Sequence, residues 1–209
     1  MASAAMVNAT EAGLFDLLAS SLPSILTRLQ ARRSDMDRYQ YLMERVGRCD
    51  VRTDANFQRT FNGLYMVRRG APWRKAFYEL FEAQKTAGEQ SFQHVLTVLH
   101  DLTGRVEASF ASKLLATIDP AMPVYDSWVR INMALRTRTG PASQRIPALC
   151  DDYAHIGAAY AWMIGQRGYE RIRADFDAAL PNLRDLSDVK KIDLLLWQSR
   201  APLGDVVGL

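Results

Sequence analysis

Two residues in the segment 107–132, Lys113 and Asp126, lie 13 residues apart in the sequence. Their side chains, an amine and a carboxylate, suit chemistry at a carbonyl-like carbon. Lys113 lies in a run of apolar and small residues that extends from Ala108 to Ile118. A lysine in such a helix either extends its amine to water or sits in a dry pocket where burial lowers its pKa. In the second case the neutral amine is a competent nucleophile for a carbonyl-like carbon.

Asp126 is the second reactive group, and its position predicts that it begins a helix. Asp119-Pro120 ends the preceding helix, because the residue before a proline avoids the helical region, and Pro123 stiffens the connection. An ordinary capping role, which contributes about 1 kcal/mol, is one interpretation of Asp126. The other is that Asp126 meets Lys113 in one cleft, where it steers protons or stabilises a developing cation during Schiff-base chemistry.

Aromatic side chains flank these two residues. Phe110, Tyr125 and Trp128 are close to them in the sequence, and Trp197 lies in the last predicted helix. Apolar faces of this kind would stack on a base extruded from a duplex. The alternative is that they belong to the hydrophobic core, which is the commoner role of aromatic residues at helical spacing.

Helices are the elements that must position this segment. Apolar residues recur at spacings of three and four in ten parts of the chain, and clear alternating strand patterns are nearly absent. The ten parts are residues 11–30, 35–46, 57–67, 72–81, 92–99, 107–118, 126–136, 147–165, 168–180 and 187–198. We expect an all-α fold with one compact helical domain over 1–209, in which two lobes meet near 107–132. Pro23 is expected to interrupt the first helix, and 137–147 to form a linker or an insertion.

The composition excludes several classes of protein. With 209 residues, 48% hydrophobic and 23% charged, the chain is neither disordered nor a collagen nor a coiled-coil rod. Cys49 and Cys150 form no CxxC pair, and the three histidines show no ligand spacing, so we expect no metal site and no cofactor. No signal peptide or long apolar run is evident, which predicts a cytoplasmic monomer without membrane contact.

The basic residues are mostly arginine, with 21 Arg against 5 Lys. Arginine suits bidentate contacts to phosphate. Most arginines fall in residues 28–75 and 130–145, on either side of an acidic stretch that contains the reactive segment. This distribution favours a groove for a polyanion, whereas the alternative is helix faces whose charges pair with one another. Candidate DNA-binding residues are Arg68, Arg69, Arg105 and Arg130.

The reactive segment resembles the helix–hairpin–helix DNA glycosylases, in particular the 8-oxoguanine DNA glycosylase fold. The residues that carry the resemblance are Ser112-Lys113-Leu114-Leu115-Ala116 and Pro123-Val124-Tyr125-Asp126-Ser127-Trp128-Val129. The chain is similar to a short, hairpin-poor member, because the turn at residues 102–107 has one glycine and the Lys-to-Asp spacing is shorter than is usual there.

The resemblance implies a bifunctional enzyme that acts on duplex DNA with a damaged or modified base. Lys113 would attack the sugar and displace the base, Asp126 would stabilise the positive charge, and β-elimination would then cut the strand. Repair and defence against modified phage DNA would use this same chemistry. A different class of function, a non-catalytic helical module that binds DNA or a protein partner, is the alternative.

Overall fold

The computed structural model describes residues 2–87 and 91–199, and within these ranges the chain is all-α, as the sequence predicts. The helices are α1 (Ala2–Ala31), α2 (Arg33–Arg45), α3 (Ala55–Leu64), α4 (Ala71–Lys85), α5 (Phe92–Thr103), α6 (Ala108–Ile118), α7 (Ser127–Asn132), α8 (Ala142–Ile164), α9 (Tyr169–Ala179) and α10 (Asp188–Gln198), with short 3-10 segments η1 (Val46–Arg48) and η2 (Pro181–Leu183). No strand occurs among the described residues.

The predictions that differ most from the structure concern two prolines. The helix α1 continues through Pro23, because buried leucine and isoleucine side chains on both sides of it hold the helix against the core. The helix α8 begins at Ala142, so half of the expected linker is helical. Pro147 lies in the second turn of α8 and removes one backbone hydrogen bond there, which the long helix tolerates.

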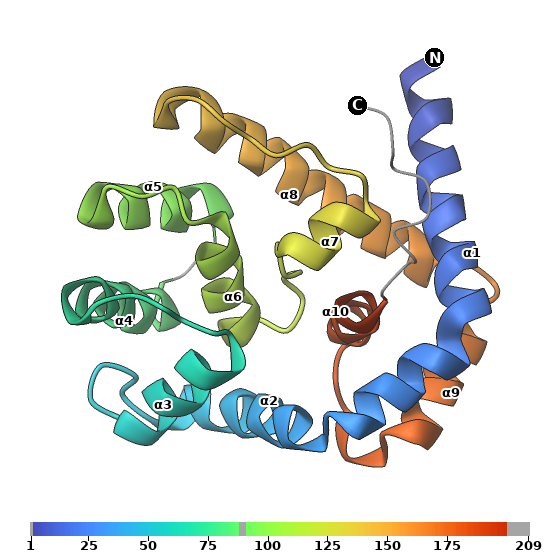
Figure 1. Cartoon of the computed structure of the whole chain (residues 1–209), viewed down its shortest axis with the longest axis horizontal. Helices are drawn as coiled ribbons and strands as arrows, with labels where there is room; N and C mark the ends of the chain where they lie inside the picture. The colour runs from blue at the N-terminus through green and yellow to red at the C-terminus, as the bar shows by residue number, and fades with distance from the viewer. Residues whose placement is uncertain (1, 88–90, 200–209) are drawn as a thin grey trace.

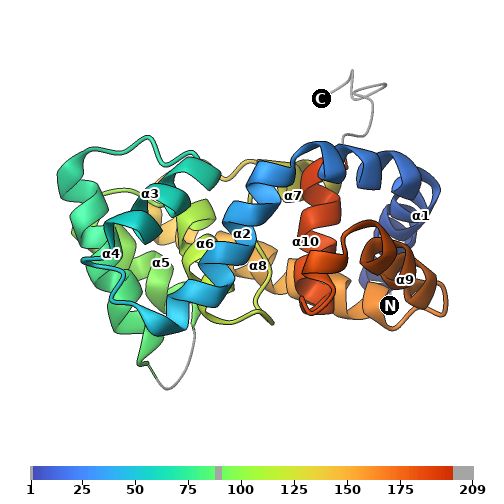
Figure 2. The ribbon, with the colours of Figure 1, turned by 90° about the horizontal axis from the view of Figure 1, so that it is seen from below.

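The helices α8, α1, α2, α3, α4 and α5 follow one another around the molecule, and α6, α7 and α10 lie inside them (Figure 1). Seen from below, α3, α4 and α5 lie at one end and α1 and α9 at the other, with α2, α7, α8 and α10 between them (Figure 2). The long helix α8 contacts α5 at one end and α1 and α10 at the other. The helix α2 contacts α1, α3 and α6, and so joins the two groups on the opposite side.

An aromatic cluster fixes the position of α6, the helix that carries Lys113. Phe61 and Phe77, both fully buried, have ring centroids 5.6 Å apart between α3 and α4. Phe110 of α6 joins this cluster, with its ring centroid 5.0 Å from Trp73 and 6.2 Å from Phe77. Burial of such rings contributes about 1.5–3 kcal/mol each, so α6 is held firmly against α4.

None of the helices in the described part of the chain is long and apolar enough to cross a membrane.

Candidate active site

The irregular connection between α6 and α7, residues 119–126, is held at its backbone carbonyl groups by side chains of α8, α10 and the residue before α10. The donor and acceptor pairs are Ser187 Oγ to Pro120 O, Lys190 Nζ to Met122 O and Tyr153 Oη to Pro123 O (2.9 Å). Because each of three nearby carbonyl groups is bonded, the path that leads to Asp126 has little freedom to move.

Ser112 holds the same connection from α6. Its hydroxyl oxygen is fully buried, accepts the N–H of Tyr125 (2.9 Å) and lies 3.2 Å from the carbonyl oxygen of Tyr125. Ser112 is one residue from Lys113 and Tyr125 is one residue from Asp126, so this contact holds the helix that carries Lys113 against the residue before Asp126. The sequence shows this serine, but only the fold reveals its partner.

Asp193 of α10 is a site residue that the sequence analysis did not identify. Its carboxylate accepts hydrogen bonds from Val124 N–H (3.0 Å) and Tyr160 O–H (3.0 Å), and it pairs with Lys190 (2.9 Å). Burial raises the pKa of Asp193, and the adjacent Lys190 ammonium opposes this effect. No sequence motif marks it, because two of its partners, Val124 and Tyr160, lie far away in the chain.

Asp126 is the N-cap of α7, as the sequence predicts. Its side chain accepts the backbone N–H groups of Trp128 (2.8 Å) and Val129 (2.9 Å). Both bonds go to the same carboxylate oxygen, Oδ1, and Asp126 also lines the pocket described below. The cap fixes the carboxylate at the positive end of the helix dipole, in contact with the pocket.

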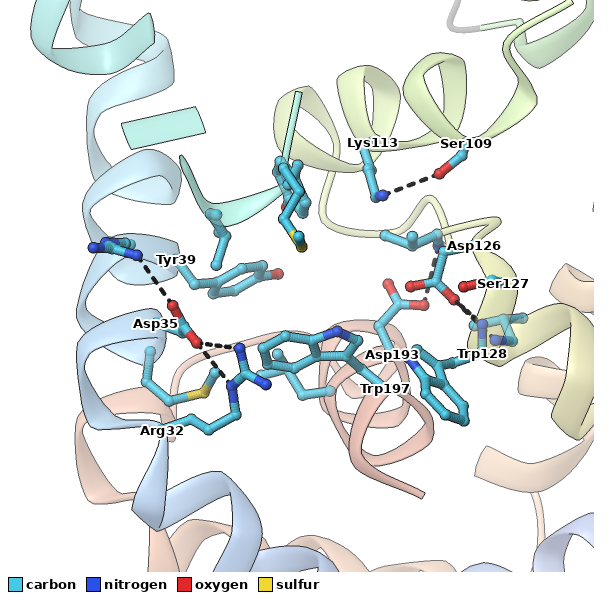
Figure 3. A pocket seen from close by; sticks show the side chains of 18 of the residues that line it. Arg32, Asp35, Tyr39, Ser109, Lys113, Asp126, Ser127, Trp128, Asp193 and Trp197 are labelled. Atoms are coloured by element: carbon cyan, nitrogen blue, oxygen red, sulfur yellow. Dashed lines mark hydrogen bonds and ion pairs between the residues drawn. The ribbon is translucent and has the colours of Figure 1, made fainter. Parts of the chain in front are cut away.

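Lys113 lies across the pocket from Asp126 (Figure 3). Its amine donates to Ser109 Oγ (3.0 Å) and lies 5.2 Å from the Tyr65 ring centroid and 5.8 Å from that of Phe110. Burial lowers the pKa of Lys113, and the negative charge of Asp126 partly opposes this effect. Among the described residues, no carboxylate forms an ion pair with the Lys113 amine.

A pocket of about 660 Å³ brings these groups together. Lys113 and Asp126 both line it, as do Trp128, Asp193 and Trp197. Its volume is in the usual range of small-molecule sites. Its walls come from α2, α3, α6, α7 and α10 (Figure 3).

The four predicted base-pocket residues divide into two pairs. Trp128 and Trp197 line the pocket. Tyr125 is 7% exposed and lies outside the lining, because the bonds to Ser112 turn its backbone towards α6. Phe110 lies outside the lining too, because its ring packs into the aromatic cluster against α4. Tyr125 and Phe110 therefore pack against the core and do not line this pocket.

The rim of the pocket holds a salt-bridge chain that the sequence analysis did not identify. The Arg32 guanidinium stacks over the Trp197 ring at 4.6 Å and pairs with Asp35 (2.7 Å). Asp35 also pairs with Arg38 (3.3 Å). Met66 lies on the same pocket, 62% exposed and with a left-handed backbone (φ 51°). Such backbone strain in a residue other than glycine is common at functional sites.

The four candidate DNA-binding arginines do not line one common cavity. Arg69 and Arg105 line a second cavity, of about 360 Å³, next to the turn between α5 and α6, with His100 and Arg145. Arg69 is paired with Glu107 (2.9 Å), so its charge is partly neutralised. Arg68 is exposed, Arg130 donates to the Leu135 carbonyl oxygen (3.3 Å), and neither lines one of these two cavities.

Among the described residues, no three His, Cys, Asp or Glu side chains are placed so as to hold a metal ion. Comparison with protein-family models, with curated proteins and with solved structures gave no match to this chain.

Proposed function

We propose that this protein is a DNA glycosylase with AP lyase activity, which excises a damaged or modified base through a Schiff base formed by Lys113. The observation that carries the proposal is one pocket lined by a half-buried amine and by a carboxylate at a helix N-terminus. Two tryptophan rings in the same lining supply faces on which a base can stack.

Lys113 supplies the nucleophile. The lowered pKa increases the fraction of neutral amine at physiological pH, and Ser109 orients the nitrogen by its hydrogen bond. As the nitrogen binds C1′ of the deoxyribose, the bond from C1′ to the base breaks and its electron pair leaves with the base, which takes up a proton. The nitrogen then passes a proton to O4′ as the bond from C1′ to O4′ breaks, which opens the sugar ring and leaves a protonated Schiff base. Loss of a C2′ proton then expels the 3′ phosphate, and water releases the lysine.

Asp126 supplies the negative charge. The bond from C1′ to the base breaks with positive charge developing on the sugar, and a carboxylate fixed in advance stabilises that charge without rearranging. Because the backbone bonds to Trp128 and Val129 hold only Oδ1 of Asp126, Oδ2 is left to face the sugar. Loss of a group of this kind typically costs about 10²–10³-fold in rate.

The second cavity suits the DNA backbone. Arg105 is exposed there, and Arg145 and His100 face the same space. Arginines grouped in this way bind phosphate, and such contacts position a duplex without reading its sequence. We assign the phosphates that flank the extruded nucleotide to this cavity.

Borohydride trapping tests the proposal. Wild-type protein is incubated with duplexes that carry 8-oxoguanine, other modified bases or a preformed abasic site, and the covalent adduct and the released base are measured. We expect an adduct whose peptide map places the label on Lys113. Lys113→Gln should abolish trapping, whereas Lys75→Gln, at an exposed residue outside the pocket, should leave it unchanged.

Two results would overturn the proposal. One is trapping that survives Lys113→Gln, which would place the reactive amine elsewhere. The other is salt-dependent duplex binding with no base release and no adduct on any substrate. This second result is what a non-catalytic binding module predicts.

A further inference from the structure

Tyr39 of α2 has a buried hydroxyl group without a partner. The residue is 6% exposed, and among the described residues nothing accepts or donates a hydrogen bond at its Oη. Buried polar groups are almost always bonded, because an unmet hydroxyl costs stability. Phenylalanine would pack its ring here equally well and has no hydroxyl group. We therefore expect the hydroxyl group of Tyr39 to have a role other than packing.

The hydroxyl points into the pocket. Tyr39 lines it, and Figure 3 shows the ring extending from α2 so that its oxygen lies between Lys113 and Trp197. Asp126 and α7 lie on the other side of the same space (Figure 3). Tyr39 therefore faces the pocket from the side opposite to Asp126 (Figure 3).

The protonation state of this hydroxyl is fixed. Burial raises the pKa of Tyr39 well above its usual value, and the nearby Tyr65 and Asp193 raise it further. The group is then neutral over the whole physiological range. A neutral phenol both donates and accepts hydrogen bonds, so it suits a polar edge that carries a carbonyl oxygen or a ring nitrogen.

We propose that the Tyr39 hydroxyl binds the polar edge of the extruded base and is a specificity-determining residue of this pocket. The proposal rests on the proposed function. The sugar lies between Lys113 and Asp126, the base extends from it towards α2 along the face of Trp197, and its edge completes the hydrogen bonding of Tyr39. A base that lacks a polar atom at that edge leaves the Tyr39 hydroxyl without a hydrogen-bond partner and is therefore released more slowly.

The test measures the rates of the Tyr39→Phe variant and of the wild type on two substrates. One is the modified-base duplex that the wild type processes best, and the other is the same duplex with a preformed abasic site, which has no base to contact. We expect kcat/KM for base release to fall about tenfold, the upper end for one neutral hydrogen bond. Strand cleavage at the abasic site should stay within about twofold of wild type, because those steps involve only the sugar.

Tyr78→Phe is the matched control. Tyr78 is also buried, but its hydroxyl donates to Asn62 Oδ1 (2.9 Å) outside this pocket. We expect Tyr78→Phe to lower the thermal unfolding midpoint without changing either rate. Tyr39→Phe should show the opposite result, with an unchanged or raised midpoint and slower base release.

Each outcome decides the matter. If wild type releases base and Tyr39→Phe is equally fast, the role of Tyr39 is refuted while the glycosylase assignment stands. If Tyr39→Phe slows base release and abasic cleavage equally, or lowers the midpoint as Tyr78→Phe does, its hydroxyl has a structural role. If wild type releases no base and cleaves no abasic site, both proposals fall together.

Discussion

Two substitutions at Asp126 separate its capping role from its proposed catalytic role. Asparagine caps a helix about as well as aspartate does, because its side-chain oxygen also accepts from backbone N–H groups, but it carries no charge. Alanine removes both the cap and the charge. Asp126→Asn therefore tests the carboxylate alone, and Asp126→Ala tests the carboxylate together with the two bonds to Trp128 and Val129.

The expected magnitudes follow from these contacts. Asp126→Ala should lower the free energy of unfolding by about 1 kcal/mol, the typical value for loss of an N-cap. For a chain of this size that corresponds to a fall of about 2–4 °C in the unfolding midpoint. Asp126→Asn loses only the interaction of the charge with the helix dipole, about 0.3–1 kcal/mol. Both variants should reduce base release at least about 100-fold.

Asp54 gives a matched control for both measurements. It caps α3 in the same way, accepting from Asn56 N–H (3.0 Å) and Phe57 N–H (2.9 Å), and it lies outside the pocket. Asp54→Ala should cost at least as much stability as Asp126→Ala, since Asp54 also pairs with Arg45 (2.9 Å), yet it should leave base release unchanged. The assays are urea unfolding followed by circular dichroism and single-turnover base release.

A catalytic role of the Asp126 charge is refuted if Asp126→Asn keeps wild-type base release. It is equally refuted if the loss of activity follows the loss of stability, with Asp54→Ala as inactive as Asp126→Ala. In that event Asp126 would be only a cap.

Three further predictions concern charge and strain. The rate of borohydride trapping at an abasic site should rise with pH through a pKa below the 10.5 usual for lysine, because only neutral Lys113 attacks; an inflection at or above 10.5 contradicts this. Asp193→Asn should cost about 3–5 kcal/mol in urea unfolding, because Lys190 is 1% exposed and loses its only ion pair among the described residues; a cost below about 1 kcal/mol contradicts this. Met66→Gly should raise the free energy of unfolding by about 1 kcal/mol by relieving its left-handed backbone; an unchanged midpoint in a thermal scan contradicts this.

Local signals were enough to find the helices and the cap of Asp126. Apolar spacing predicted an all-α chain, and Asp119-Pro120 marked the end of α6. Prolines within helices misled the prediction, since packing of the flanking side chains outweighed the loss of one backbone bond at Pro23 and at Pro147.

The pocket was only partly predictable. The sequence suggested that Lys113 and Asp126 meet, because a short connection between two helices can fold back on itself. It gave no sign of Asp193 or Tyr39, which line the same pocket from helices far away in the chain. It also placed Tyr125 and Phe110 beside the reactive residues without revealing that their rings face the core.

The sequence by itself determined which residue types could react and which segments form helices, because helix periodicity, proline stops and N-caps act over a few residues. The tertiary structure decided the environment of each reactive group. Whether Lys113 is desolvated depends on Tyr65 and Phe110 next to its amine, and the pocket wall formed by Tyr39 and Trp197 depends on α2 and α10 lining the same space. Burial and long-range packing set pKa values and pocket shape, and neither is encoded at fixed sequence spacing.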